Sequence, residues 1–272
     1  MHKTIRNLLF LVLAMLLAAT AVAEASKSQP VIAIIIDDMG DKLSRGKKAI
    51  ALPGKVTLSF LPYSSHAKRL AKKAHASGKE IMLHLPMETE TGKQLGPGGL
   101  TLHMTEKEIK ATTSKAVQSI PHVKGINNHM GSLLTRHPGA MEWFVHAVKE
   151  HGNLYFVDSR TSAHTVARQI AVENGLSSAS RDVFLDHVQS KKAIRKEFRR
   201  LVKLAKKQGF AIGIGHPHPE TLAVLNQELS SLDSKGIRLI SVSEMIKLQQ
   251  ADAPKQGYPA NSQKVAKRLQ DE

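Results

Sequence analysis

Acidic and imidazole side chains recur in this sequence at the points where apolar, strand-like runs end. The clearest case is the pair Asp37–Asp38, which directly follows the apolar run Val31–Ile36. Carboxylates and imidazoles hold divalent metal ions and move protons, so these residue types could carry out metal-assisted hydrolysis. Later runs end in or contain residues of the same kinds, namely His84 and Glu88, Asn127 to His129, Asp158, Asp186, and His216 and His218.

Each of these residues also has a structural interpretation. Adjacent aspartates after a strand often cap a turn or a helix, and a single His84 within a strand is more often a hydrogen-bonded core histidine. Their joint occurrence favours a functional site, because several uncompensated carboxylates buried together would be costly and a divalent cation would offset that cost. The chain contains no Cys. A metal would therefore be held by His and carboxylate, a ligand set that suits Zn²⁺.

Apolar runs alternate with helical patterns along most of the chain, which predicts an α/β fold with a parallel sheet. In such folds ligands bind at the carboxyl ends of the strands, where the acidic and imidazole residues would gather. If the first strand continued through Asp37 and Asp38, their side chains would point to opposite sides. The runs predicted to be strands are Val31–Ile36, Val56–Leu61, Glu80–Leu85, Val123–Asn127, Leu154–Val157, Asp182–Leu185, Phe210–Gly215 and Ile237–Ser241.

The N-terminus has the pattern of an export signal. A short basic region precedes the apolar run Leu8–Ala19, and the small residues Ala21 to Ala23 follow it. The run is shorter than the roughly 20 residues of a membrane-spanning helix. We therefore expect residues 1–23 to be a cleaved signal peptide, with an uncleaved anchor as the alternative. The mature protein would lie in the periplasm or cell envelope, without stable membrane insertion.

The remaining chain is expected to comprise a linker (24–29), one domain (30–249) and a polar, disordered tail (250–272), and to be a monomer. The chain is strongly basic, with 39 Lys and Arg against 23 Asp and Glu and a net charge of +16. Anionic partners are favoured. Nucleic acid is not expected, since aromatic residues are few and no base-reading motif is present. Much of the excess lies in the run Lys191–Lys207, whose simpler interpretation is a solvated helix face.

Six motifs resemble, in their order along the chain, the divergent branch of the polysaccharide deacetylase superfamily. The resemblance covers Pro30 to Leu248 and implies a single domain built as a distorted (β/α) barrel of about seven parallel strands. The motifs are IAIIIDDMG, IMLHLPMET, NNHMGS, FVDSRT, DVFLD and GIGHPHPET.

The resemblance also implies a metal site that holds a divalent cation such as Zn²⁺. The metal-binding aspartate of the family corresponds to Asp38, and the first of two metal-binding histidines corresponds to His84. The second histidine of the family falls on Glu88 in this chain. The third ligand is therefore either Glu88 or His129, of which we favour His129.

The groups that move protons follow from the same resemblance. Asp37 corresponds to the catalytic base and His216 to the general acid, with His218 as the neighbouring alternative for the acid. Asp158 is the candidate for a carboxylate that orients a catalytic histidine.

The implied activity is a metal-dependent hydrolysis that removes acetyl groups, N- or O-linked, from an acetylated envelope polysaccharide such as peptidoglycan. The alternative is a catalytically weak or inactive protein with the same fold that binds or scaffolds in the cell envelope. Glu88 in place of histidine, and NNHMGS in place of the arginine motif usual in the superfamily, favour this alternative.

Overall fold

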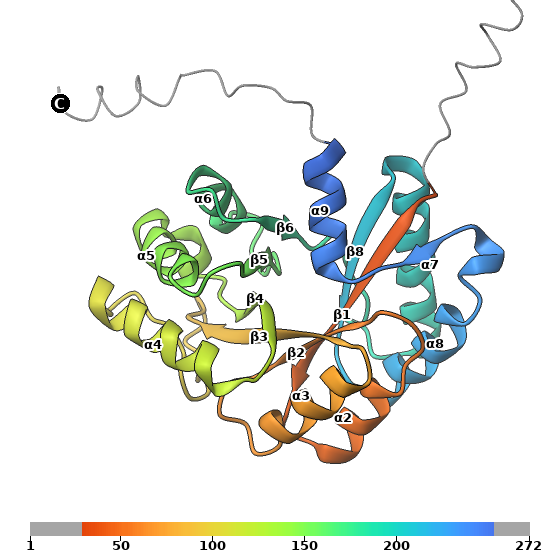
Figure 1. Ribbon diagram of the computed structural model, residues 1–272, viewed down its shortest axis with the longest axis horizontal. Helices are drawn as coiled ribbons and strands as arrows, with labels where there is room; N and C mark the ends of the chain where they lie inside the picture. The colour runs from red at the N-terminus through yellow and green to blue at the C-terminus, as the bar shows by residue number, and fades with distance from the viewer. Residues whose placement is uncertain (1–28, 253–272) are drawn as a thin grey trace, which may run out of the picture.

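The computed structural model describes residues 29–252, in which parallel strands form one curved sheet with helices on its outside (Figure 1). The sheet has nine strands in this part of the chain. Eight follow the order β6-β5-β4-β3-β2-β1-β8-β7, and β9 pairs with β1. The strands are β1 (Val31–Met39), β2 (Thr57–Phe60), β3 (Glu80–Met87), β4 (Val123–Met130), β5 (Tyr155–Asp158), β6 (Ser178–Ser180), β7 (Val183–Phe184), β8 (Phe210–Gly215) and β9 (Arg238–Leu239).

One short segment completes the barrel. β6 and β7 are its two halves: β6 pairs with β5, and β7 pairs with β8. Between them, Arg181 N donates to Asp158 O (3.0 Å) and Asp182 N donates to Ile212 O (2.9 Å). If β6 and β7 are counted as one strand and β9 is left out, seven strands of the described part surround the barrel interior. The predicted α/β fold, a distorted (β/α) barrel in a single domain, is confirmed.

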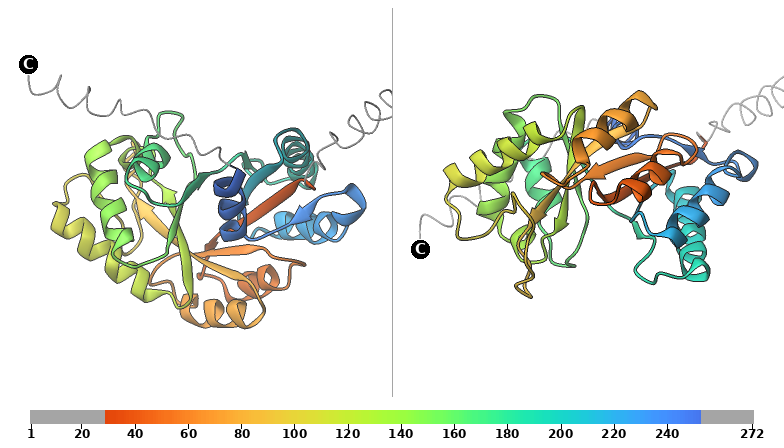
Figure 2. Two further views of the ribbon diagram at one scale, coloured as in Figure 1. Left: turned by 45° about the horizontal axis from the view of Figure 1, so that its top comes forward. Right: turned by 90° about the horizontal axis from the view of Figure 1, so that it is seen from below.

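Helices cover the outer surface of the sheet, as the two further views show (Figure 2). They alternate with the strands along the chain, as the sequence predicts, whereas the strand β6 is not among the predicted runs. α2 carries Gly46 at its centre, where the side chain of Leu70 leaves no room for a Cβ. The helices are α2 (Leu43–Ile50), α3 (Ala67–Ala76), α4 (Glu106–Ser119), α5 (Pro138–Lys149), α6 (Ala167–Glu173), α7 (Lys191–Gln208), α8 (Pro219–Leu229) and α9 (Val242–Asp252), with 3₁₀ turns at Leu134–Arg136 and Asp233–Lys235.

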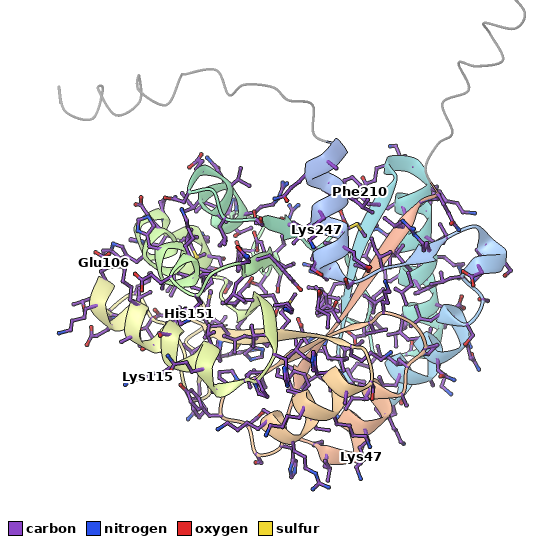
Figure 3. All side chains as sticks on the ribbon, in the orientation of Figure 1. Lys47, Glu106, Lys115, His151, Phe210 and Lys247 are labelled. Atoms are coloured by element: carbon purple, nitrogen blue, oxygen red, sulfur yellow. The ribbon has the colours of Figure 1, made fainter. Side chains whose placement is uncertain are left out.

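The side chains of β1 divide the core into two parts because successive residues of a strand face opposite sides. Ile32, Ile34 and Ile36 pack outward against the surrounding helices. Ala33 and Ile35 face the barrel interior, where α9 contributes a second apolar cluster. Charged side chains such as those of Lys47, Glu106 and Lys115 project from the outer helices (Figure 3). The sheet therefore has apolar side chains on both of its faces, and charged side chains lie on the exposed sides of the helices and at the strand ends.

The predictions for the two ends of the chain fall largely outside the described residues. α9 continues to Asp252, so the first residues of the segment expected to be a disordered tail are helical, and residues 253–272 lie outside the described part. The predicted signal peptide (1–23) also lies outside the described residues. Within residues 29–252, no helix combines the length and apolar character needed to cross a membrane.

The amino-terminal end of the barrel is fixed by one partly buried glutamate, Glu80. Glu80 Oε1 accepts hydrogen bonds from Tyr155 Oη (2.7 Å), Thr57 Oγ1 (3.1 Å) and Ser243 N (3.2 Å), which join β2, β3, β5 and α9. Gly125 on β4 makes this possible, since the ring of Tyr155 occupies the place where a Cβ of residue 125 would lie.

We therefore expect Gly125→Ala to lower the free energy of unfolding by about 1–3 kcal/mol, because the added methyl group displaces a packed ring. Gly96→Ala is the matched control: it lies in a loop where a Cβ meets nothing within 4 Å, and it should change stability by less than about 0.5 kcal/mol. Urea unfolding followed by circular dichroism measures both. Equal stabilities of the two variants would contradict this account of Gly125.

Candidate metal and catalytic site

Both carboxylates at the end of β1 face the same site. Asp38 has a φ of 53°, in the left-handed region, and the strand register shifts between Ile36 and Met39. This irregularity breaks the alternation of side chains that a regular strand would show. The prediction that Asp37 and Asp38 point to opposite sides is therefore wrong: His84 Nε2 lies 3.6 Å from Asp37 Oδ2 and 3.4 Å from Asp38 Oδ1.

Asp38, His84 and His129 form a group of possible metal ligands at the carboxyl ends of β1, β3 and β4. Parallel pairing of β3 with β4 brings the two histidines together, since Pro86 is the register partner of His129. His129 Nδ1 lies 3.1 Å from Asp38 Oδ1 and 3.1 Å from His84 Nε2. Two imidazole nitrogens and one carboxylate oxygen thus converge on one point.

The spacing and hydrogen bonding of these three atoms suit a bound cation. Ligands that bind Zn²⁺ tetrahedrally at about 2.0–2.1 Å lie roughly 3.3 Å from one another, and the observed separations are 3.1 to 3.4 Å. Asp38 Oδ1 is also buried without a hydrogen-bond partner of acceptable geometry. An unpartnered buried oxygen is costly unless a cation balances it. The residues present therefore fit a divalent metal.

Asn127 sets the orientation of His84. Its amide nitrogen donates to both carboxylate oxygens of Asp37 (2.9 and 3.1 Å), so its amide oxygen faces His84 Nδ1 at 2.8 Å. His84 Nδ1 is then the protonated nitrogen, and the Nε2 lone pair points at Asp38 and His129. Hydrogen bonding of this kind fixes the tautomer of a metal-binding histidine.

The charges of the site also favour a cation. Burial by itself would raise the pKa of Asp38, but the facing ring nitrogens and the charges of His129 and His84 hold it well below its usual range. Burial lowers the pKa of His84, while the charges of Asp37 and Asp38 outweigh this effect and raise it. The Asp38 carboxylate therefore stays ionised and attracts positive charge to the point where the three ligand atoms meet.

Asp37 lies beside this point with its carboxylate almost fully buried, at 2 % exposure. Burial raises its pKa, although the nearby charges of His84 and His216 and the hydrogen bond from Asn127 act in the opposite direction. A carboxylate with a raised pKa is a better proton acceptor than a surface carboxylate. The position and environment of Asp37 match those of a general base.

His216 approaches from the end of β8 and is held by Asp186, which follows β7. Asp186 Oδ1 lies 3.0 Å from His216 Nδ1, and Asp186 Oδ2 accepts from His216 N (2.7 Å) and Thr221 Oγ1 (2.8 Å). His216 Nε2 faces the site, 3.8 Å from Asp38 Oδ2. Burial lowers the pKa of His216, but Asp186 and the charges of Asp37 and Asp38 raise it overall to about 9. The imidazole is therefore protonated at neutral pH and can donate from Nε2.

The residue that orients this histidine is Asp186, not Asp158. The Asp158 carboxylate accepts from Arg160 N (2.8 Å) and Thr165 Oγ1 (2.9 Å), so it stabilises the turn before α6. Sequence reasoning included Asp186 among the strand-end residues but did not select it. Like Asp37 and Asp158, Asp186 directly follows an apolar run. Only the pairing of β7 with β8 shows that Asp186, rather than Asp158, lies beside His216.

Glu88 is placed outside the group of possible ligands. Its Oε2 accepts a hydrogen bond from Leu102 N (2.6 Å), and its backbone carbonyl accepts from Leu133 N (3.1 Å) and Leu134 N (3.2 Å). Glu88 therefore holds the loop after β3 against the 3₁₀ turn Leu134–Arg136. Of the two candidates for the third ligand, His129 converges with Asp38 and His84, and Glu88 does not.

His218 lines a small cavity beside the site. The cavity has a volume of about 160 Å³ and is also bordered by Asp38, Arg45 and His216. Asp186, His216 and His218 form a second group with ligand-like spacing, but both oxygens of Asp186 already accept hydrogen bonds. His218 is thus placed to contact a bound molecule, while His216 has the carboxylate partner expected of a general acid.

Fold and site agree with the result of comparing the chain with known proteins. This chain belongs to the divergent polysaccharide deacetylase family, which it matches over residues 34–246. The predicted resemblance is confirmed.

Relatives in three bacteria share most of the chain. The chain is 37% identical over 252 residues to YibQ, an uncharacterized protein of Escherichia coli (strain K12), covering 92% of this chain and 77% of YibQ. It is 33% identical over 230 residues to an uncharacterized protein of Haemophilus influenzae (strain ATCC 51907 / DSM 11121 / KW20 / Rd), covering 85% and 81%. The crystal structure of uncharacterized protein ATU2773 from Agrobacterium tumefaciens C58 superimposes with a TM-score of 0.77 at 25% identity, covering 80% and 89%.

We expect purified protein to bind one equivalent of Zn²⁺, and His84→Ala or His129→Ala to weaken binding at least about 10-fold, because each removes a ligand. Glu88→Gln should bind Zn²⁺ like the unchanged protein. Isothermal titration calorimetry and elemental analysis measure both properties. Loss of zinc in Glu88→Gln, with retention in His129→Ala, would reverse the assignment of the third ligand.

Proposed function

We propose that this protein is a metal-dependent hydrolase that removes N- or O-linked acetyl groups from a carbohydrate polymer of the cell envelope. The observation that carries the proposal is the meeting of three groups at one end of the barrel. These groups are the ligand set of Asp38, His84 and His129, the buried base Asp37, and the Asp186–His216 pair. Amide and ester hydrolysis needs all three: a Lewis acid, a base for water and an acid for the leaving group.

The proposed substrate follows from the family and from the charge of the chain. The family is described by its deacetylation of polysaccharides, and the chain carries a net charge of +16. A strongly basic protein favours an anionic polymer over a neutral one. Peptidoglycan, or another acetylated and anionic wall polymer, is therefore the preferred substrate class, and a periplasmic location after removal of residues 1–23 is consistent with it.

The roles of the side chains follow from their positions. A divalent metal held by Asp38, His84 and His129 would supply Lewis acidity towards an acetyl carbonyl and water. Asp37, kept in place by Asn127, accepts a proton from the water that attacks the carbonyl carbon. His216 donates its Nε2 proton to the leaving amine or alcohol as the bond between carbon and the leaving atom breaks, and Asp186 holds the ring in place.

The alternative, an inactive binding or scaffold protein, receives less support from the geometry. It was favoured by two departures from the family pattern, at Glu88 and in the segment NNHMGS. That segment itself supplies His129 as a ligand, Asn127 as the partner of Asp37, and Asn128, whose Oδ1 accepts from Ser159 N (2.8 Å). The segment NNHMGS therefore brings site residues of its own, including a candidate for the ligand that Glu88 does not provide.

The direct test is acetate release from N- and O-acetylated glycans, including purified peptidoglycan, by zinc-loaded protein. We expect Asp37→Asn to reduce the rate by about 10²–10⁴-fold, because the amide cannot accept a proton, while zinc content is unchanged. Glu88→Gln, the same carboxylate-to-amide change outside the site, should keep full activity. Zinc-loaded protein that releases no acetate from any of these glycans would support the scaffold alternative.

A second test isolates the acid. His216→Ala should slow hydrolysis of an acetamide by about 10²-fold or more, yet slow hydrolysis of an aryl acetate far less, since a phenolate leaves without prior protonation. Asp186→Asn should show the same selectivity, more weakly, because Asp186 acts by positioning His216. An equal loss of kcat on both substrates would exclude His216 as the general acid.

A further inference from the structure

The outer face of α7 carries a line of cations that the proposed hydrolysis does not use. Along this helix, Ile194, Phe198 and Leu201 pack into the core, and the opposite side is exposed. Glu197 is the one acidic residue of the helix, and it is buried against Arg200. The exposed basic residues of the helix are Lys191, Lys192, Lys196, Arg199, Arg200, Lys203, Lys206 and Lys207.

Five of these residues lie in one row. Lys192, Lys196, Arg199, Lys203 and Lys206 follow one another at intervals of three and four residues, which places them on the same helix face. At a rise of about 1.5 Å per residue, the row is roughly 21 Å long. Among residues 29–252, no ion pair involves any of the five, whereas Arg195 and Arg200 pair with Glu228 and Glu197.

This arrangement is unfavourable for the isolated helix. Like charges four residues apart destabilise a helix, and α7 contains such pairs at Lys192–Lys196, Lys196–Arg200, Arg199–Lys203 and Lys203–Lys207. A helix face that served only to be solvated would gain stability from alternating Glu and Lys. The row of cations is explained if an anionic partner compensates the repulsion.

The shape and surroundings of the face indicate the kind of partner. α7 lies at the periphery of the molecule (Figures 1 and 2), and all five residues of the row are exposed. The large apolar side chains exposed in the described part of the chain, at Tyr63, Val172, Val188 and Leu248, all lie outside α7. An exposed row of cations without aromatic platforms suits a flat anionic surface better than a single glycan strand.

The first strand of the fold begins beside the C-terminal end of α7. Val31 N donates to Gly209 O (2.9 Å), so β1 begins beside the end of α7 that carries Lys203, Lys206 and Lys207. Figure 1 shows this end of β1 next to the upper end of α7. The cationic end of α7 thus lies beside the first strand of the described fold.

We propose that the basic face of α7 binds the anionic phospholipid headgroups of a membrane surface and holds the protein against it without insertion. Each cation near such a surface adds to the attraction, and the effect extends over about one Debye length. This inference does not depend on the proposed hydrolase activity.

Co-sedimentation of the full chain with vesicles tests the proposal. Vesicles of phosphatidylcholine alone are compared with vesicles of an equal mixture of phosphatidylcholine and phosphatidylglycerol. We expect binding to the mixed vesicles only, and its loss at about 1 M salt, where the screening length falls to about 3 Å. All variants carry the same N-terminus, so differences between them report on the substituted face.

The diagnostic variant is Lys196→Glu/Lys203→Glu, with Lys48→Glu/Lys72→Glu as the matched control. Both pairs of substitutions lie at exposed helix positions and change the net charge equally, but the control residues are on α2 and α3, away from α7 (Figure 1). The α7 variant should bind mixed vesicles at least about 30-fold more weakly, and the control should lose much less. The thermal midpoint of the α7 variant should be unchanged or higher, because each new Glu gains basic partners three and four residues away.

Two results would overturn the proposal. One is an equal loss of binding in the two variants, which would show a general charge effect. The other is a different pattern: the unchanged protein does not bind mixed vesicles but binds isolated anionic wall polymer, and the α7 variant loses this binding. Such a result would show that the basic face of α7 binds the polymer.

Discussion

The structure depends on two neighbouring carboxylates at the end of β1, of which Asp37 is buried and Asp38 is partly buried. Asp37 and Asp38 lie side by side at the carboxyl end of an apolar barrel, where uncompensated negative charge would be costly. The surrounding polar groups partly compensate that negative charge. Asn127 donates to Asp37, His84 and His129 direct ring nitrogens at Asp38, and the protonated His216 faces both carboxylates. The remaining imbalance is what a divalent cation would neutralise.

The barrel makes this arrangement precise enough to be useful. Parallel pairing brings His84 beside Asn127 and Pro86 beside His129, so three strands deliver their polar side chains to one point. At the amino-terminal end of the barrel, the hydrogen bonds of Glu80 join β2, β3 and β5 to α9. Because the strands are fixed at both ends, the ligand atoms are held within 3.1 to 3.4 Å of one another.

Charge of the two signs is separated across the molecule. The acidic residues that matter for chemistry are buried at the barrel mouth, whereas the excess of positive charge is concentrated on exposed helices, above all on α7. A cationic exterior would draw the protein to anionic surfaces and polymers of the envelope, while the buried carboxylates remain shielded from them. Location and chemistry can thus be controlled by different parts of one domain.

The sequence by itself determined the alternation of strands and helices and the class of fold, because apolar periodicity is a local signal. It also placed Asp37, Asp38, His84, His129 and His216 at strand ends, since each follows or lies within an apolar run. The tertiary structure alone decided the partners. The left-handed φ of Asp38 directs both carboxylates to the same site. Pairing of β7 with β8 places Asp186, and not Asp158, beside His216. A hydrogen bond from Leu102 N holds the Glu88 carboxylate outside the site. Such choices depend on register and on distances between segments far apart in the chain, which residue types and spacing along one strand do not encode.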